Sequence, residues 1–218
     1  MVKKLARVPY DEVVGYWLKF EYKDREELRK HIGSRFSHED IEEAVVSEHD
    51  YSDQNANAKR HDMLESYRPF INWFSHAEWW RATLDENDIS NLLVIHSIHW
   101  EKLSHGTLKA IDIARTIDEN KDKEALSKYS GHVSKVIDGL EEKIREDSRI
   151  IIVAPKDGKV YTVIDGVHRA IRLCLYYIVR KNPFPGEHGL SQESYLGLTP
   201  DPIEYAADQW EKDSALFR

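Results

Sequence analysis

Residues 165–169, Asp-Gly-Val-His-Arg, place a carboxylate, a glycine, an imidazole and a guanidinium side by side. The apolar, β-branched residues 160–164 before them predict a buried strand. Residues 170–179 after them space their apolar side chains as on one face of a helix. A strand that turns at glycine into a helix directs backbone N–H groups and the positive end of the helix dipole at one point. His168 and Arg169 add side-chain donors there, so the sequence predicts a phosphate-binding site.

Each residue of this segment has an expected role. Gly166 allows the main chain to approach a phosphate closely, because it has no side chain. Val167 contributes through its backbone, and Arg169 can bind two phosphate oxygens at once. Asp165 is expected to hold Mg²⁺ or to accept a proton from a substrate hydroxyl. The alternative is a purely local role, in which Asp165 and Arg169 form an ion pair that caps the helix and His168 is exposed.

The segment resembles the Asp-Gly-x-His-Arg signature of the ParB/sulfiredoxin-like superfamily, which includes chromosome-partition proteins, sulfiredoxins and archaeal free-serine kinases. The resemblance extends over about residues 90–182, under half of the chain. It implies that the Gly-x-His-Arg turn holds the phosphates of ATP or another nucleoside triphosphate. The residues that the resemblance assigns to the nucleotide are Gly166, Val167, His168 and Arg169. Asp165 is the candidate Mg²⁺ ligand because of its carboxylate.

The individual branches of that superfamily match less well. Free-serine kinases use the acid of a His-Glu pair before their first helix as a base, whereas this chain has Glu101 and His105 in that region without the pair. Sulfiredoxins have a cysteine where this chain has Val167. The helix-turn-helix and second arginine-rich motif of partition proteins are not evident. The candidates for catalysis are therefore Asp165, Glu101 and His105, in that order.

Periodicity and capping patterns predict the elements around the segment. Helices are expected over 10–20, 25–32 and 75–84, and from Ser37, Ser104 and Leu126 onwards. Strands are expected over 91–98 and 149–154, with a hairpin turn at 156–159. Residues 51–60 are polar and predict a loop. Residues 183–189 predict another loop, and 202–216 a final helix.

This order predicts an α+β protein with a ParB/sulfiredoxin-like core, whose sheet is small and mixed. The expected boundaries are a helical extension over 1–88, a nucleotide-binding core over 89–182 and a C-terminal loop and helix over 183–218. A net charge of −8 disfavours a dedicated DNA-binding protein. The single cysteine, Cys174, excludes an intramolecular disulfide. No segment is apolar enough to predict a membrane span or a signal peptide, so a cytoplasmic protein is expected.

The sequence therefore favours a kinase-like phosphotransferase or a nucleoside triphosphate hydrolase that acts on a small-molecule hydroxyl acceptor. The alternative is a ParB-like, DNA-associated protein or nuclease, in which the turn binds a DNA phosphate or a regulatory nucleotide. A histidine cluster at His96, His99 and His105 could also bind a metal ion, although ordinary core or surface positions are favoured because no cysteine or acidic partner has ligand spacing.

Overall fold

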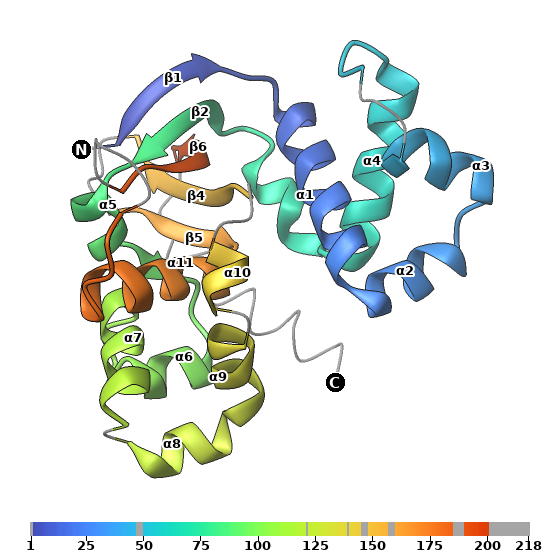
Figure 1. Cartoon of the computed structure of the whole chain (residues 1–218). Coiled ribbons are helices and arrows are strands. Elements are labelled where there is room, and N and C mark those ends of the chain that lie inside the picture. The colour runs from blue at the N-terminus through green and yellow to red at the C-terminus, as the bar shows by residue number, and fades with distance from the viewer. Residues whose placement is uncertain are drawn as a thin grey trace. The chain divides into compact units, whose positions relative to one another are not determined.

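The computed structural model describes residues 2–46, 50–120, 122–138, 140–144, 148–156, 160–184 and 190–200. The chain divides into two compact units (Figure 1). One unit is Arg7–Trp79, and the other joins Met1–Ala6 to Trp80–Arg218. The expected C-terminal helix over 202–216 and most of the expected turn at 156–159 lie outside the described residues, as does most of the expected loop over 183–189.

The larger unit is built on a mixed sheet, which confirms the α+β class. Its six described strands are ordered β1-β2-β6-β4-β5-β3. They are β1 (Lys3–Arg7), β2 (Glu78–Leu84), β3 (Leu93–Val94), β4 (Ile150–Pro155), β5 (Thr162–Asp165) and β6 (Gln192–Thr199). β4 runs antiparallel to β5 and parallel to β6, while β3 runs parallel to β5.

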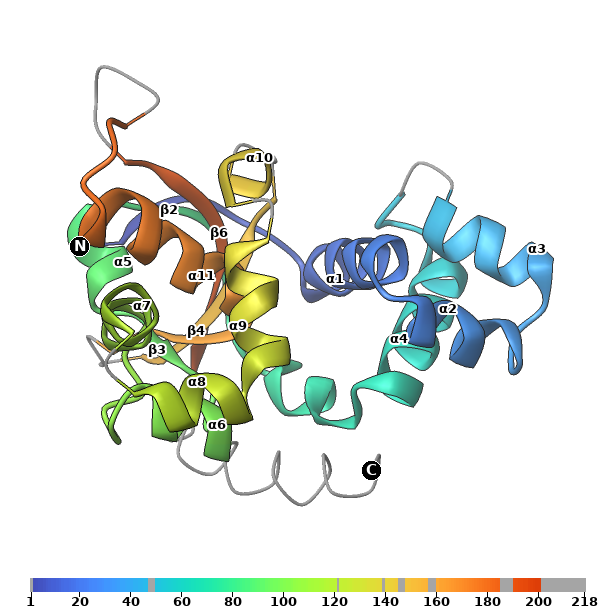
Figure 2. The same ribbon diagram turned by 60° about the horizontal axis from the view of Figure 1, so that its bottom comes forward.

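Helices pack with this sheet around one hydrophobic core (Figure 1). They are α5 (Glu86–Ser90), α6 (Ile98–Leu103), α7 (Ala110–Glu119), α8 (Lys123–Lys128), α9 (Ser130–Ile137), α10 (Leu140–Ile144) and α11 (Val167–Leu173), the last continued by a π-helical segment over Cys174–Val179. Figures 1 and 2 both place α9 beside α11, in agreement with the contacts between them. Helices α7, α9 and α10 therefore pack against α11.

The core of this unit forms because every side chain from Ile150 to Ala154 is buried, as expected for a strand covered on both faces. Ile171 and Leu173 of α11 pack against it together with residues of α7. Cys174 is also fully buried in this cluster, and its thiol lies 3.6 Å from the carbonyl oxygen of Ile89. Burial raises the pKa of the Cys174 thiol, so this cysteine is a core residue and not a nucleophile.

The unit Arg7–Trp79 is helical, with α1 (Tyr10–Asp24), α2 (Glu26–Gly33), α3 (His38–Ile41), a π-helical turn (Glu42–Val46), α4 (Gln54–Tyr67) and a 3-10 segment (Pro69–Phe74). α1 packs against α4, and polar contacts join them at both ends. Asp11 accepts hydrogen bonds from Asn57 at 3.0 Å and lies 2.8 Å from His61. Glu21 accepts a hydrogen bond from Arg68 at 2.8 Å.

Several local predictions are confirmed. The expected helices over 10–20 and 25–32 are α1 and α2, and Ser37 caps α3 by accepting a hydrogen bond from the N–H of Asp40. The expected strand over 149–154 is β4. These segments have a clear apolar period or a capping residue, so their local sequence is sufficient to specify them.

Other local predictions were wrong. Residues 78–84 form strand β2 and not a helix, and the polar segment 51–60 contains the start of α4, which Asp53 caps. The expected strand over 91–98 shortens to Leu93–Val94 and the expected helix from Leu126 is divided into α8, α9 and α10. Strands β1 and β6 were not predicted at all, so the segments 1–88 and 183–218 both contribute strands to the sheet.

Helix α5 depends on a reciprocal cap. The carboxylate of Asp85 accepts a hydrogen bond from the N–H of Asp88 at 2.8 Å, and the carboxylate of Asp88 accepts one from the N–H of Asp85 at 3.2 Å. We predict that Asp85→Ala lowers the free energy of unfolding by about 1 kcal/mol, whereas Asp85→Asn, which keeps the acceptor, costs much less. Urea unfolding followed by tryptophan fluorescence measures the difference. Equal midpoints for Asp85→Ala and the parent would contradict the assignment.

Candidate phosphate site at the start of helix α11

The segment 165–169 forms the expected strand–turn–helix junction. β5 ends at Asp165, Gly166 has a φ of +82°, and α11 begins at Val167. The first intrahelical hydrogen bond runs from the N–H of Ala170 to the carbonyl oxygen of Gly166 at 2.9 Å. The N–H groups of residues 167–169 precede this bond, so they lie at the positive end of the helix dipole. Glycine suits this position because it has no Cβ and adopts a positive φ without a steric clash.

Arg169 is buried, and a residue that was not predicted from the sequence, Gln192, orients its side chain. Its Nε donates to the side-chain oxygen of Gln192 at 3.2 Å. The amide nitrogen of Gln192 in turn donates to the carbonyl oxygens of Ser148 and Glu193, at 2.8 and 2.7 Å. The guanidinium is thus held between α11 and the first residue of β6, with its plane set by the Nε contact.

His168 lies in a cluster of rings instead of being exposed. Its imidazole centroid is 5.4 Å from the ring of Trp100 in an edge-to-face arrangement. His132 of α9 lies on another side, with an Nδ1 to Nε2 distance of 3.5 Å between His132 and His168. His99 of α6 stacks on His132 with centroids 3.9 Å apart. Three helices, α6, α9 and α11, therefore each contribute an imidazole to one cluster.

The remaining candidates lie around this cluster to different degrees. Trp100 confirms that the segment after β3 lies beside the Gly-x-His-Arg turn, because its ring touches His168. Glu101, the next residue of α6, has a carboxylate oxygen 3.5 Å from Nε2 of His96. His105 has a left-handed φ of +54°, and its Nε2 lies 3.3 Å from the hydroxyl of Thr116 on α7. Asp165 is half-buried at the end of β5.

The three histidines considered as a metal cluster meet three different partners, namely Glu101 for His96, His132 for His99 and Thr116 for His105. Within the described ranges, no group of three or more His, Cys, Asp or Glu side chains is arranged to hold a metal ion. His96 and His99 also do not alternate along a strand, since His99 belongs to α6.

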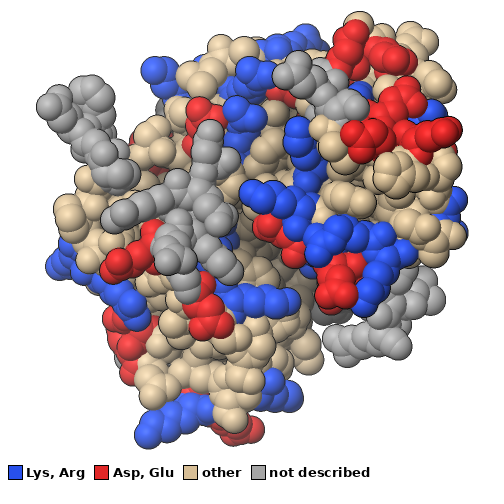
Figure 3. All heavy atoms as spheres, turned by 45° about the vertical axis from the view of Figure 1, so that its right-hand side comes forward, with Lys and Arg blue, Asp and Glu red and all other residues tan. Residues whose placement is uncertain are grey.

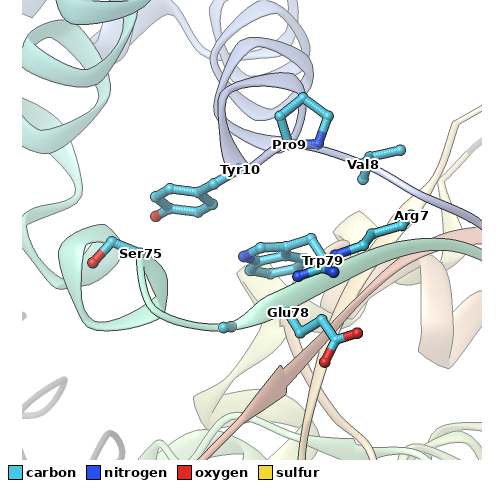
Figure 4. Close-up of a pocket in the computed structure, with 8 residues that line it drawn as sticks. Arg7, Val8, Pro9, Tyr10, Ser75, Glu78 and Trp79 are labelled. Atoms are coloured by element: carbon cyan, nitrogen blue, oxygen red, sulfur yellow. The ribbon is translucent and has the colours of Figure 1, made fainter.

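A separate cavity of about 410 Å³ lies within the unit Arg7–Trp79 (Figure 4). Figure 4 shows Tyr10 and Trp79 next to each other, and their rings stack with centroids 5.8 Å apart. The hydroxyl of Tyr10 donates to the carbonyl oxygen of Ile71, and burial, followed by Asp11 and Glu65, raises the pKa of this phenol. The two rings are therefore packing residues, and Trp79 is 2% exposed.

No protein-family model matches the chain, and neither the curated proteins nor the solved structures contain a match to it. None of the described helices is long and apolar enough to cross a membrane.

The left-handed backbone of Gly166 gives a direct test of the junction. An added Cβ would meet Ile150 at an ordinary contact distance of 3.5 Å, so the cost of a side chain comes from the backbone conformation. We predict that Gly166→Ala lowers the free energy of unfolding by roughly 1–2 kcal/mol. Gly131→Ala in α9 is the matched control, because it has open space around the added methyl and should stabilise the helix by about 0.5–1 kcal/mol. Equal effects of the two substitutions, measured by chemical unfolding, would contradict the left-handed assignment.

Proposed function

We propose that the protein is a nucleotide-dependent phosphotransferase or nucleoside triphosphate hydrolase built on a ParB/sulfiredoxin-like core. The observation that carries the proposal is the junction from β5 through left-handed Gly166 to α11. It directs main-chain N–H groups at one point, beside the imidazole of His168 and next to a segment that follows another strand of the sheet. The antiparallel pair of β4 and β5 that leads into α11 agrees with the element order expected from the sequence.

In this proposal the phosphates of a triphosphate bind the N–H groups at Val167 and His168 and the side chains of His168 and Arg169. Nε of Arg169 donates to Gln192, which orients the guanidinium beside the phosphate turn. A guanidinium already oriented by the protein loses less conformational freedom when it binds, which favours affinity.

Mg²⁺ would enter this site with the nucleotide. The ion is commonly held by one or two carboxylates together with phosphate oxygens and water, and Asp165 supplies one carboxylate directly before the phosphate turn. The residues present therefore fit a metal that is bound jointly by the protein and the nucleotide. When bound, such an ion would neutralise charge that develops on the phosphates.

The acceptor side of the site is proposed to lie between Asp165 and the segment from Trp100 to His105. A hydroxyl acceptor needs a base within hydrogen-bond reach, and Asp165 is the first candidate because its place at the turn is fixed. Glu101 is the second, one residue from Trp100 on α6, with His96 as its present neighbour. His105 is the third, with its ring beside Thr116.

The rival function is binding of DNA through the same turn. A nucleic-acid surface requires many basic side chains gathered into a stripe or groove. The face of the molecule in Figure 3 shows acidic and basic side chains intermixed. The whole chain has 31 Lys and Arg against 39 Asp and Glu. The charge balance thus supports a small-molecule acceptor over a DNA partner.

We predict that ATP with Mg²⁺ binds the parent protein and that Arg169→Ala weakens binding about tenfold to several hundredfold, since charge-assisted hydrogen bonds to phosphate are lost. Titration calorimetry is the measurement. Arg115→Ala, which removes an exposed arginine that pairs with Asp112 on α7, is the control and should leave affinity unchanged. Thermal unfolding of Arg169→Ala is measured in parallel, because this side chain is buried.

Arg169→Lys separates charge from geometry, because it keeps the positive charge but not the planar fork. It should fall between the parent and Arg169→Ala. A parent that binds duplex DNA but no triphosphate would favour the rival function. Equal triphosphate affinity in folded Arg169→Ala and the parent would remove Arg169 from the site.

We predict that Asp165→Asn lowers the rate of triphosphate turnover by about 100-fold or more, while affinity for the nucleotide without metal changes only a few fold. Glu101→Gln and His105→Ala are measured in the same way, with smaller losses expected in that order. Full turnover in all three variants would place the catalytic base on other residues.

A further inference from the structure

His132 and His168 point ring nitrogens directly at each other. Their centroids are 5.7 Å apart and their planes differ by 6°, while Nδ1 of His132 and Nε2 of His168 are 3.5 Å apart. The centroid–centroid distance exceeds the nitrogen–nitrogen distance by about twice the distance from the centre of an imidazole ring to one of its nitrogens. Both nitrogens must therefore lie near the line between the ring centres. The contact is thus a long, nearly linear N–H···N arrangement that holds one proton at a time.

A metal ion does not fit between these two nitrogens. Two nitrogens on a tetrahedral metal ion approach it from directions about 109° apart, so their rings are inclined to each other and do not meet head-on. The nitrogens of His132 and His168 instead lie near the line between the two ring centres, 3.5 Å apart. A shared proton is therefore the interaction that matches the geometry.

The environment of His132 favours its neutral form. Burial lowers the pKa of His132, and the nearby Lys135 on the same helix lowers it further. Among the residues that the structure describes, His99 of α6 stacks on its ring, Tyr129 lies beside His99, and His168 approaches from α11. Arg172 of α11 donates to the carbonyl oxygens of Lys135 and Val136, which ties α11 to the same stretch of α9.

Two neutral arrangements of the pair are conceivable, and they differ in what His168 offers to a ligand. If Nε2 of His168 carries the proton, its Nδ1 is an acceptor and repels a phosphate oxygen. If Nδ1 of His132 carries the shared proton, Nε2 of His168 accepts it. Neutral His168 then has its own proton on Nδ1, the nitrogen nearer the main chain and the start of α11. Only the second arrangement gives the site another hydrogen-bond donor for an anion.

We infer that His132 is a positioning residue, which donates its Nδ1–H to Nε2 of His168 and so fixes His168 as an Nδ1–H donor. The direction of this hydrogen bond rests on the proposed function, because an anionic phosphate favours the arrangement in which His168 presents an Nδ1–H. The same principle governs metal-binding histidines, where the hydrogen bond at one nitrogen determines what the other presents. His99, stacked on His132 at 3.9 Å, holds the donating ring in place.

Two substitutions of His132 separate its hydrogen bond from its packing. His132→Phe keeps an aromatic ring that can stack on His99 but has no nitrogen. His132→Asn loses the ring but keeps an amide near the position of Nδ1. We expect His132→Phe to weaken binding of ATP with Mg²⁺ about tenfold, in the range expected for a weakened hydrogen bond to a charged group. His132→Asn should retain affinity within about threefold of the parent, and thermal unfolding confirms that both variants fold.

Nitrogen-15 NMR of the imidazoles tests the tautomer without any ligand. The signals are assigned by their disappearance in His132→Phe and His168→Asn. At neutral pH the parent is expected to show both His132 and His168 protonated at Nδ1, and His168 should lose this preference in His132→Phe. A parent with His168 protonated at Nε2, or a His168 tautomer unchanged in His132→Phe, would overturn the inference.

The two readouts keep the inference and the proposed function apart. If the parent shows the expected tautomers but binds no triphosphate, the proposed function fails and the positioning role of His132 stands. If the parent binds triphosphate but His168 is protonated at Nε2, the inference fails and the function stands. Equal affinity of His132→Phe and the parent would also count against the inference, because positioning would then have no effect on the ligand.

Discussion

The left-handed backbone of Gly166 is the constraint on which the rest of the candidate site depends. It allows the buried strand β5 to pass into α11 within one residue. The direction of α11 then determines where His168 and Arg169 lie, because both belong to its first turn. Ile150 of the neighbouring strand lies 3.5 Å from the position of a Cβ at this glycine, so the sheet packs closely behind the turn. The turn is consequently supported by the core and not by a surface loop.

Burial of Arg169 makes the site depend also on Gln192, which is 23 residues away in the sequence. A buried guanidinium needs hydrogen-bond partners, because an uncompensated charge in the interior is costly. Gln192 supplies one, and its own amide is satisfied by the carbonyl oxygens of Ser148 and Glu193. These contacts join the start of β6 to the residues just before β4. They therefore reinforce the parallel pairing of β4 and β6 and couple the order of the sheet to the position of the arginine.

Local sequence predicted the parts of the fold that local interactions specify. The junction at Gly166, helix α1 and strand β4 follow from a glycine, an apolar helical period and a β-branched run. β6 was missed because its buried positions include Gln192, Ser194 and Thr199, so no apolar alternation marks it. Residues 75–84 carry a helix-capping pattern, yet pairing in the sheet prevailed over that preference. His132 was missed for a related reason: it is 36 residues from His168 in sequence, and only packing of α9 on α11 brings them together.

The cluster of His99, Trp100, His132 and His168 connects three helices that are far apart in the sequence. α6 carries His99 and Trp100, α9 carries His132, and α11 carries His168, so the cluster forms only when all three helices are in place. The hydrogen-bonding state of His168 then depends on the packing of two helices outside the signature segment. A sequence with the same five signature residues but a different residue at 132 would keep the turn and the main-chain donors. It would lose control over which nitrogen of His168 carries the proton, which means that the signature alone does not define the chemistry of the site.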